Sequence, residues 1–247
     1  MKAFVVADVH SNIELLADLL QQEGIIDSNR NRIDFETKVI QLGDLANGVA
    51  VDTNNDVECL KRVEDWFDVY LCGNHEHPYL GGPAFNGFFK DAVIAHHLGF
   101  LKASRFIKPC VEVDGILISH AGVTPDWGWE SAKEAEYVLL REWENDPGQS
   151  APFARIGAAR GGMGRTGGVL WSDWMEKKCH DFNQIVGHTA APKVRRRDYG
   201  NGNWALCIDT GCEMGNRFKN EKDNIELTGA WIEDGEVRTV SCVQECH

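Results

Sequence analysis

The sequence lacks any long hydrophobic run. No stretch of about 18 apolar residues, the length of a membrane-spanning helix, occurs among its 247 positions. The first apolar segment, Ala3–Ala7, is too short for the hydrophobic region of a signal peptide and is followed at once by Asp8. We therefore expect a cytoplasmic protein with no membrane partner.

Paired cysteine motifs are also missing. The eight cysteines are scattered and form no Cys-x-x-Cys pair, which is the spacing typical of many zinc and redox sites. In a chain without an export signal this pattern predicts reduced thiols rather than a disulfide framework.

Positive charge is scarce. The chain carries 25 Lys and Arg against 38 Asp and Glu, a formal net charge of −13. Carboxylates repel phosphates, so broad binding to duplex DNA is excluded, although a local basic patch is not. Carboxylates are also natural ligands of divalent cations.

Internal repeats and low-complexity segments are absent as well. The chain is 43% hydrophobic and 26% charged, a composition typical of globular proteins. We predict one domain over residues 1–247. Composition shifts only at 155–168, where six glycines accompany Arg155, Arg160 and Arg165, and there we expect a mobile loop.

Short apolar runs alternate with helical patterns along the chain. Strands are predicted at 4–7, 38–42, 68–72, 116–119, 184–186, 204–208, 226–232 and 236–240. Helices are predicted after Ser11 and near 56–65, 86–98 and 130–144, the first begun by a capping box of Ser11 and Glu14. The Asp234-Gly235 step between the last two strands predicts a tight hairpin turn.

Five of the predicted strands end in side chains that can bind a metal. These side chains are Asp8 and His10, Asp44, Asn74 with His75, His120, and His188. In open α/β sheets, ligands bind beyond the carboxyl ends of strands, so these residues are expected to converge. Their nitrogen and oxygen donors suit divalent transition metals, and Asp44 could bridge two ions.

The same strand ends resemble the calcineurin-like metallophosphoesterases. The matching motifs are Asp8-Val9-His10, Gly43-Asp44, Gly73-Asn74-His75-Glu76, Ser119-His120-Ala121-Gly122 and Gly187-His188-Thr189. Two further segments, Leu170–Asp173 and Ile208–Gly211, are similar to the phosphoprotein phosphatase branch. That branch includes small bacterial and phage serine/threonine phosphatases and symmetrical dinucleoside tetraphosphatases.

The resemblance implies an α/β (α+β) fold, a four-layer α-β-β-α sandwich. Two mixed sheets would be flanked by helices and would hold a dinuclear metal site at the strand ends. By resemblance, Asp8 and His10 bind one ion and Asp44 bridges both. The ligands of the second ion would be Asn74, His120 and His188. Mn²⁺ is the favoured metal, with Fe, Zn and Ni as alternatives.

The implied reaction is hydrolysis of a phosphate ester by a metal-bound hydroxide, with His75 as the general acid. The alternative, that His75 is a fifth metal ligand and not the general acid, stays open. The substrate could be a phosphorylated small molecule, a nucleotide or a phosphoprotein. More specific alternatives for the function are therefore a symmetrical dinucleoside tetraphosphatase or a serine/threonine protein phosphatase. The non-enzymatic alternative is a catalytically silent binding module on the same fold.

The sequence departs from the family after Asp44. Where the phosphoprotein phosphatases continue with Asp-Arg-Gly, this chain has Asn47-Gly48. Asn47 replaces an aspartate that would orient His75, which predicts a lower pKa for this histidine. The arginine of the family motif, which binds the phosphate, is missing from this chain, and Arg160 or the Arg195–Arg197 run could replace it. We predict Asn47 and Arg160 as substrate-binding residues.

Overall fold

The computed structural model describes residues 1–46, 53–85, 88–177, 180–212 and 225–244. Its larger sheet has six strands in the order β11-β10-β1-β2-β3-β4. The strands β1 to β4 run parallel, whereas β10 and β11 are antiparallel to their neighbours. The strand bounds are β1 Ala3–Val6, β2 Lys38–Gln41, β3 Val69–Leu71, β4 Ile107–Lys108, β10 Ile225–Glu233 and β11 Glu236–Gln244.

The smaller sheet has five strands in the order β5-β6-β7-β9-β8. In it β6, β7 and β9 are parallel, and the two edge strands are antiparallel. The bounds are β5 Cys110–Val113, β6 Ile116–Ser119, β7 Asn183–Val186, β8 Arg195–Asp198 and β9 Trp204–Cys207. The strand β8 was not predicted, because three consecutive arginines carry no apolar alternation; it lies at a sheet edge, where charged side chains are tolerated.

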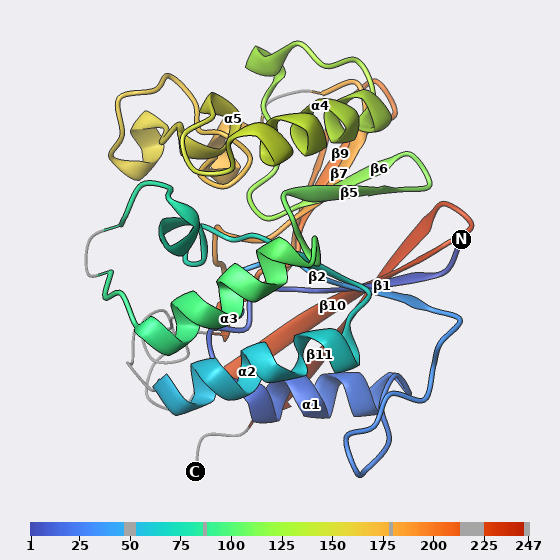
Figure 1. Ribbon diagram of the computed structural model, residues 1–247. Coiled ribbons are helices and arrows are strands. Elements are labelled where there is room, and N and C mark those ends of the chain that lie inside the picture. The colour runs from blue at the N-terminus through green and yellow to red at the C-terminus, as the bar shows by residue number, and fades with distance from the viewer. Residues whose placement is uncertain (47–52, 86–87, 178–179, 213–224, 245–247) are drawn as a thin grey trace.

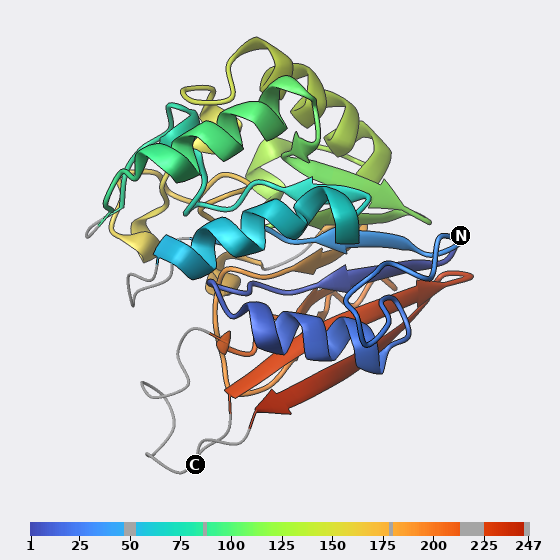
Figure 2. The same ribbon diagram turned by 60° about the horizontal axis from the view of Figure 1, so that its bottom comes forward.

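Helices cover the outer faces of the two sheets. The helix α1 packs on β10 and β11, α3 packs on β4, and α4 packs on β5 and β6; Figures 1 and 2 show α1, α2 and α3 together on one side of the molecule and α4 beside β5 and β6. The predicted four-layer sandwich is confirmed. The helix bounds are α1 Ile13–Gln22, α2 Thr53–Trp66, α3 Ala92–Ala103, α4 Ala132–Asn145 and α5 Ala151–Ala154, with single 3₁₀ turns η1 His77–Leu80, η2 Pro125–Trp127, η3 Ala158–Arg160 and η4 Trp174–Glu176.

The predicted capping box at the first helix is wrong. Asn12 caps α1, and its side chain accepts a hydrogen bond from the Leu15 backbone N–H. Ser11 has a left-handed backbone with φ 67°, and its hydroxyl donates instead to the Asp56 carboxylate on α2. The Ser11 side chain thus bonds to Asp56, which is distant in sequence, and not to the start of its own helix as predicted.

Two other boundaries show how local chemistry sets the elements. The third helix begins at Ala92, later than predicted, because the Asp91 side chain caps it by accepting from the backbone N–H groups of Val93 and Ile94. The Asp234-Gly235 hairpin is confirmed. Both residues have positive φ, 51° and 81°, as a type I′ turn requires.

The core is continuous between the sheets. Phe4 and Val39 from the larger sheet belong to the same buried cluster as Ile118 and Ile185 from the smaller one. Within the described ranges, no helix is long and apolar enough to cross a membrane. The assignment of residues 1–247 to one domain stays a prediction.

Candidate metal centre

The six predicted metal ligands lie together where strands of both sheets end. Asp8 and His10 follow β1, Asp44 follows β2, Asn74 follows β3, and His120 and His188 follow β6 and β7. Parallel strands end at the same edge of a sheet, so residues up to 180 positions apart in the chain meet here; the backbone N–H of His188 donates to Asp8 Oδ2 at 2.9 Å.

His120 occupies the middle of this group and is fully buried. Its Nε2 atom lies 2.9 Å from Asn74 Oδ1 and 3.1 Å from His188 Nδ1. The same atom lies 3.5 Å from Asp44 Oδ2. The other ring nitrogen, Nδ1, faces the Leu42 carbonyl at 3.0 Å, which fixes the orientation of the imidazole.

Two clusters of donor atoms share Asp44. In each cluster, one potential ligand atom per residue lies within 4.8 Å of the others: His10, Asp44 and His75 form one, and Asp44, His120 and His188 form the other. This sharing matches the bridging position that the resemblance implies for Asp44. His75 is thus part of the first cluster, with Nε2 3.8 Å from Asp44 Oδ2.

The residues present fit a pair of divalent cations. Asp8 Oδ1 and His188 Nε2 are buried and have no hydrogen-bond partner within the described part of the chain. Gly187 makes room for Asp8, because a Cβ at this glycine would lie 1.9 Å from Asp8 Oδ1. Buried polar atoms are costly without partners, and a cation would satisfy these two.

The loops that present the donors have a strained backbone. His10, Asp44 and His188 all have positive φ, at 47°, 50° and 66°. Residues other than glycine rarely adopt this region, and such strain collects at functional sites, where the surrounding structure maintains it.

Burial sets the protonation of the donors. It lowers the pKa of His120 to about 3 and holds the pKa of His10 and His188 well below the usual range. Burial, followed by the nearby Asp209 and Asp44 charges, raises the pKa of Asp8. Neutral imidazoles are the form that binds metals, and a cation would relieve the repulsion between the carboxylates.

Glu76 is a site residue to which the sequence assigned no role. Its buried carboxylate accepts backbone N–H groups from two loops. Oε2 accepts from Asp44 and Gly73, both at 2.9 Å, and Oε1 accepts from Leu45 at 3.0 Å and Ala46 at 3.3 Å. Glu76 therefore fixes the two strand ends against each other. The available signal was an acidic residue directly after the Asn74-His75 pair.

The glycine-rich segment 155–168 is a loop, as predicted, and Arg160 is the arginine that it brings to the centre. The side chain of Arg160 donates to Thr189 Oγ1 at 2.6 Å and to the His188 carbonyl at 3.3 Å. Its Nε atom lies 3.0 Å from Asp173 Oδ2. Arg165 pairs with Asp126 farther out.

The other predicted positions lie elsewhere or outside the described residues. The guanidinium of Arg155 stacks on Trp127 at 3.9 Å. In the β8 run, Arg195 donates to the Thr189 carbonyl, and Arg197 donates to the Trp174 carbonyl at 3.2 Å. Asn47 lies outside the described residues.

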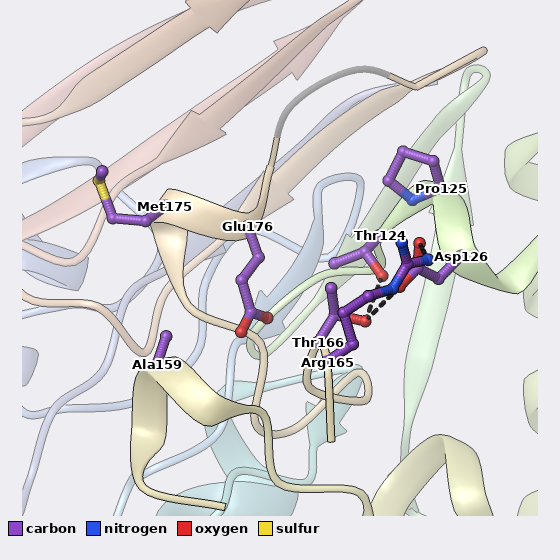
Figure 3. Close-up of a pocket in the computed structure, with 8 residues that line it drawn as sticks. All are labelled: Thr124, Pro125, Asp126, Ala159, Arg165, Thr166, Met175 and Glu176. Atoms are coloured by element: carbon purple, nitrogen blue, oxygen red, sulfur yellow. Dashed lines mark hydrogen bonds and ion pairs between the residues drawn. The ribbon is translucent and has the colours of Figure 1, made fainter. Parts of the chain in front are cut away.

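A cavity of about 340 Å³ adjoins the loop that carries Arg160. Its walls come from η2, from the glycine-rich loop and from η4, as Figure 3 shows. The lining residues are Thr124, Pro125, Asp126, Ala159, Arg165, Thr166, Met175 and Glu176. The carboxylate of Asp126 accepts from Thr166 at 2.9 Å and thereby ties η2 to the loop across the cavity.

Comparison with known proteins agrees with this geometry. No model of a protein family matches the chain. Shewanella-like protein phosphatase 1 of Plasmodium berghei (strain Anka) is 25% identical, in an alignment that covers 99% of this chain and 75% of the relative.

Solved structures share the fold. The crystal structure of a cold-active protein-tyrosine phosphatase from a psychrophilic Shewanella species has a TM-score of 0.62 and 16% identity, covering 99% of this chain and 80% of that one. A further structure of a cold-active protein tyrosine phosphatase has a TM-score of 0.58 and 18% identity, covering 96% of this chain and 78% of that one.

Fold and site together define a class. The chain has the calcineurin-like metallophosphoesterase fold, with histidine and aspartate clusters at the strand ends that suit metal ions. Its sequence is similar to that of Shewanella-like protein phosphatase 1 over nearly the whole chain.

Proposed function

We propose that the chain is a two-metal phosphatase that hydrolyses phosphate monoesters on proteins, with Mn²⁺ favoured over Fe, Zn or Ni. The observation that carries the proposal is the sharing of Asp44 by two donor clusters. A shared carboxylate is a common way to hold two cations close together for phosphoryl transfer. The protein phosphatase names of the relatives support a phosphoprotein substrate.

The proposed ligands follow the order of the strand ends. Asp8 and His10 would hold one ion, Asp44 would bridge, and the second ion would be held by Asn74, His120 and His188. When bound, the two cations supply positive charge for the phosphoryl oxygens and activate the attacking water. The positive-φ turns at His10, Asp44 and His188 orient these side chains before any substrate arrives.

We assign general acid catalysis to His75. Its side chain is 14% exposed, against 8% for His10 and none for His120, so it is the one among these three rings that best reaches a substrate. Its backbone N–H donates to Asp44 Oδ1 at 2.9 Å, which places it beside the bridging carboxylate. From there Nε2 can hold a proton and deliver it to the leaving oxygen.

Arg160 and the adjoining cavity would bind the substrate. The guanidinium of Arg160 already lies against His188, where its planar donors can also reach a phosphate oxygen. The cavity begins at the neighbouring Ala159 and gives room for the polypeptide that flanks the phosphate. Asn47 stays a predicted substrate-binding residue, and a cytoplasmic location stays a prediction.

One experiment tests this function. Protein stripped with a chelator is reloaded with Mn²⁺ and assayed on p-nitrophenyl phosphate, phosphoserine and phosphotyrosine peptides, and a symmetrical dinucleoside tetraphosphate. We expect about two metal ions per chain and turnover of the phosphopeptides. Turnover of the tetraphosphate alone would establish the alternative hydrolase. Bound metal without turnover would indicate a silent binding module, and no metal with no turnover would refute the proposal.

A further inference from the structure

The imidazole of His75 lies between two other rings. The Phe85 ring centroid is 4.2 Å from the His75 centroid, with the planes inclined by 32°. The His10 ring lies 5.0 Å away and meets His75 edge-on at 76°. One face of His75 is therefore covered by a hydrocarbon ring, and the His10 ring packs against His75 in a T-shaped pair. This packing restricts rotation of the imidazole about its side-chain bonds.

Phe85 is itself held by a chain of aromatic contacts. Its ring lies 5.6 Å from that of Phe88, and Phe88 lies 5.0 Å from Tyr79 in η1. The Phe88 backbone N–H donates to the Phe85 carbonyl at 3.1 Å, and the Tyr79 hydroxyl donates to the Phe89 carbonyl at 3.0 Å. Phe85 is thus held through Phe88, which contacts both its ring and its backbone carbonyl and packs in turn on Tyr79.

We infer that Phe85 is a positioning residue for His75, a role that rests on the proposed function of His75 as the general acid. In the reaction, the water oxygen bonds to phosphorus, the bond from phosphorus to the leaving oxygen breaks, and the proton that the water loses passes to solvent. The leaving oxygen takes the proton held at His75 Nε2. The Phe85 ring keeps the imidazole in the orientation for this transfer and shields one of its faces from water.

A role in substrate binding would predict something different. If Phe85 formed a wall for the substrate's own ring, its removal would weaken binding of every aryl phosphate to the same degree. If it acts through His75, its removal would matter most where the leaving group needs a proton. Two substrates with the same ring but different leaving groups separate these cases.

The test compares phenyl phosphate with p-nitrophenyl phosphate, because phenolate is the poorer leaving group. We expect Phe85→Ala to lower kcat for phenyl phosphate about tenfold, and kcat for p-nitrophenyl phosphate far less. Phe85→Leu should restore most of the loss. Phe89→Ala, which removes a ring that is 66% exposed, is the matched control and should change neither substrate.

A second measurement does not depend on activity. Carbethoxylation of His75 in the metal-loaded protein, followed by mass spectrometry, should proceed several times faster in Phe85→Ala than in the unchanged chain. The variant should keep its metal content. An equal rise in KM for both substrates, with an unchanged modification rate, would overturn the inference.

A parallel variant separates this inference from the proposed function. His75→Gln should keep both metals and lose kcat selectively on phenyl phosphate. If it shows that selectivity and Phe85→Ala does not, the positioning role is wrong while the general acid stands. If His75→Gln loses a metal ion, His75 is a ligand, and both assignments fail.

Discussion

The Oε2 atom of Glu76 lies 2.9 Å from the backbone nitrogen of Asp44, so a buried carboxylate holds the residue that both donor clusters share. The same carboxylate also accepts from Gly73, just before Asn74. The centre therefore depends on a buried residue that belongs to neither donor cluster. Two strand ends of the larger sheet are connected through one side chain.

Replacing Glu76 with glutamine should weaken both the fold and the centre. The amide keeps one acceptor but presents N–H groups to backbone donors, which leaves buried groups unsatisfied at a cost of about 1–3 kcal/mol. Misplacement of Asp44 should lower metal affinity by about 10–100-fold. Urea unfolding and metal titration measure the two effects. Glu36→Gln, at an exposed position, is the control, and equal behaviour of the two variants would contradict the role of Glu76.

Replacing Asp44 with asparagine should remove the bridge. We expect metal content to fall to one ion or fewer per chain, and kcat/KM to fall by roughly three orders of magnitude, since bound cations contribute several kcal/mol to the barrier. Elemental analysis and kinetics measure these changes. Asp126→Asn, at the cavity wall, should keep both ions. A fully loaded Asp44→Asn protein would show that the two clusters do not share this residue.

The strand ends could be predicted from sequence because the pattern is local. Each short apolar run is followed within a few residues by Asp, Asn or His, and parallel strands bring such positions to one edge without further information. The four-layer sandwich was predicted from the resemblance of these motifs to the calcineurin-like metallophosphoesterases. By contrast, the role of Glu76 depends on loops about 30 positions apart, at Asp44 and Gly73–Asn74, which no local pattern connects.

Long-range contacts explain the errors as well. Ser11 had every local feature of a helix cap, yet its hydroxyl bonds to Asp56 on another helix, and Asn12 took the cap. The choice between Arg160 and the Arg195–Arg197 run also needed the fold, because both segments reach the same turn at Thr189. Side-chain chemistry alone gave candidates, and because tertiary contacts bring both Arg160 and Arg195 to the Thr189 turn, the choice of Arg160 stays a prediction.

Stability should fall in mild acid partly because of His77. This ring is fully buried, its Nε2 donates to the Pro147 carbonyl at 2.7 Å, and burial lowers its pKa to about 4. The unfolded chain takes up this proton at about pH 6.5. The stabilising contribution is therefore present above that pH and is lost as the pH falls toward 4.

The variant His77→Gln isolates this effect. Glutamine can keep a donor to the Pro147 carbonyl but does not titrate. Between pH 7 and pH 4.5, the variant should therefore lose about 1–3 kcal/mol less of its free energy of unfolding than the unchanged chain loses. Urea unfolding at a series of pH values, at matched metal content, measures the difference. If the free energy of unfolding of the unchanged chain and of His77→Gln varied with pH in parallel, His77 would not be the source of the acid sensitivity.

Replacing Arg160 with alanine should weaken substrate binding. Removing the guanidinium beside His188 should raise KM for a phosphopeptide about tenfold, and Arg160→Lys should restore part of the loss, because lysine keeps the charge without the planar fork. Metal content should stay unchanged, which separates a phosphate contact from support of the His188 turn. Arg105→Ala is the control, since that exposed arginine pairs with Glu144 and does not line the cavity. Identical kinetics in the two alanine variants would refute the role of Arg160.

A bulky side chain placed in the cavity should weaken binding of a phosphopeptide more than binding of the smaller p-nitrophenyl phosphate. Ala159 is one of the residues that line the cavity of about 340 Å³, as Figure 3 shows. Ala159→Phe would occupy part of that volume, so KM for a phosphopeptide should rise several-fold while p-nitrophenyl phosphate is little affected. Ala158→Phe adds the same ring to the same turn at a position that does not line the cavity, and it should leave both substrates unchanged. If both variants impair hydrolysis of p-nitrophenyl phosphate equally, the added ring distorts the turn itself. If neither variant changes KM for the phosphopeptide, the peptide does not bind in this cavity.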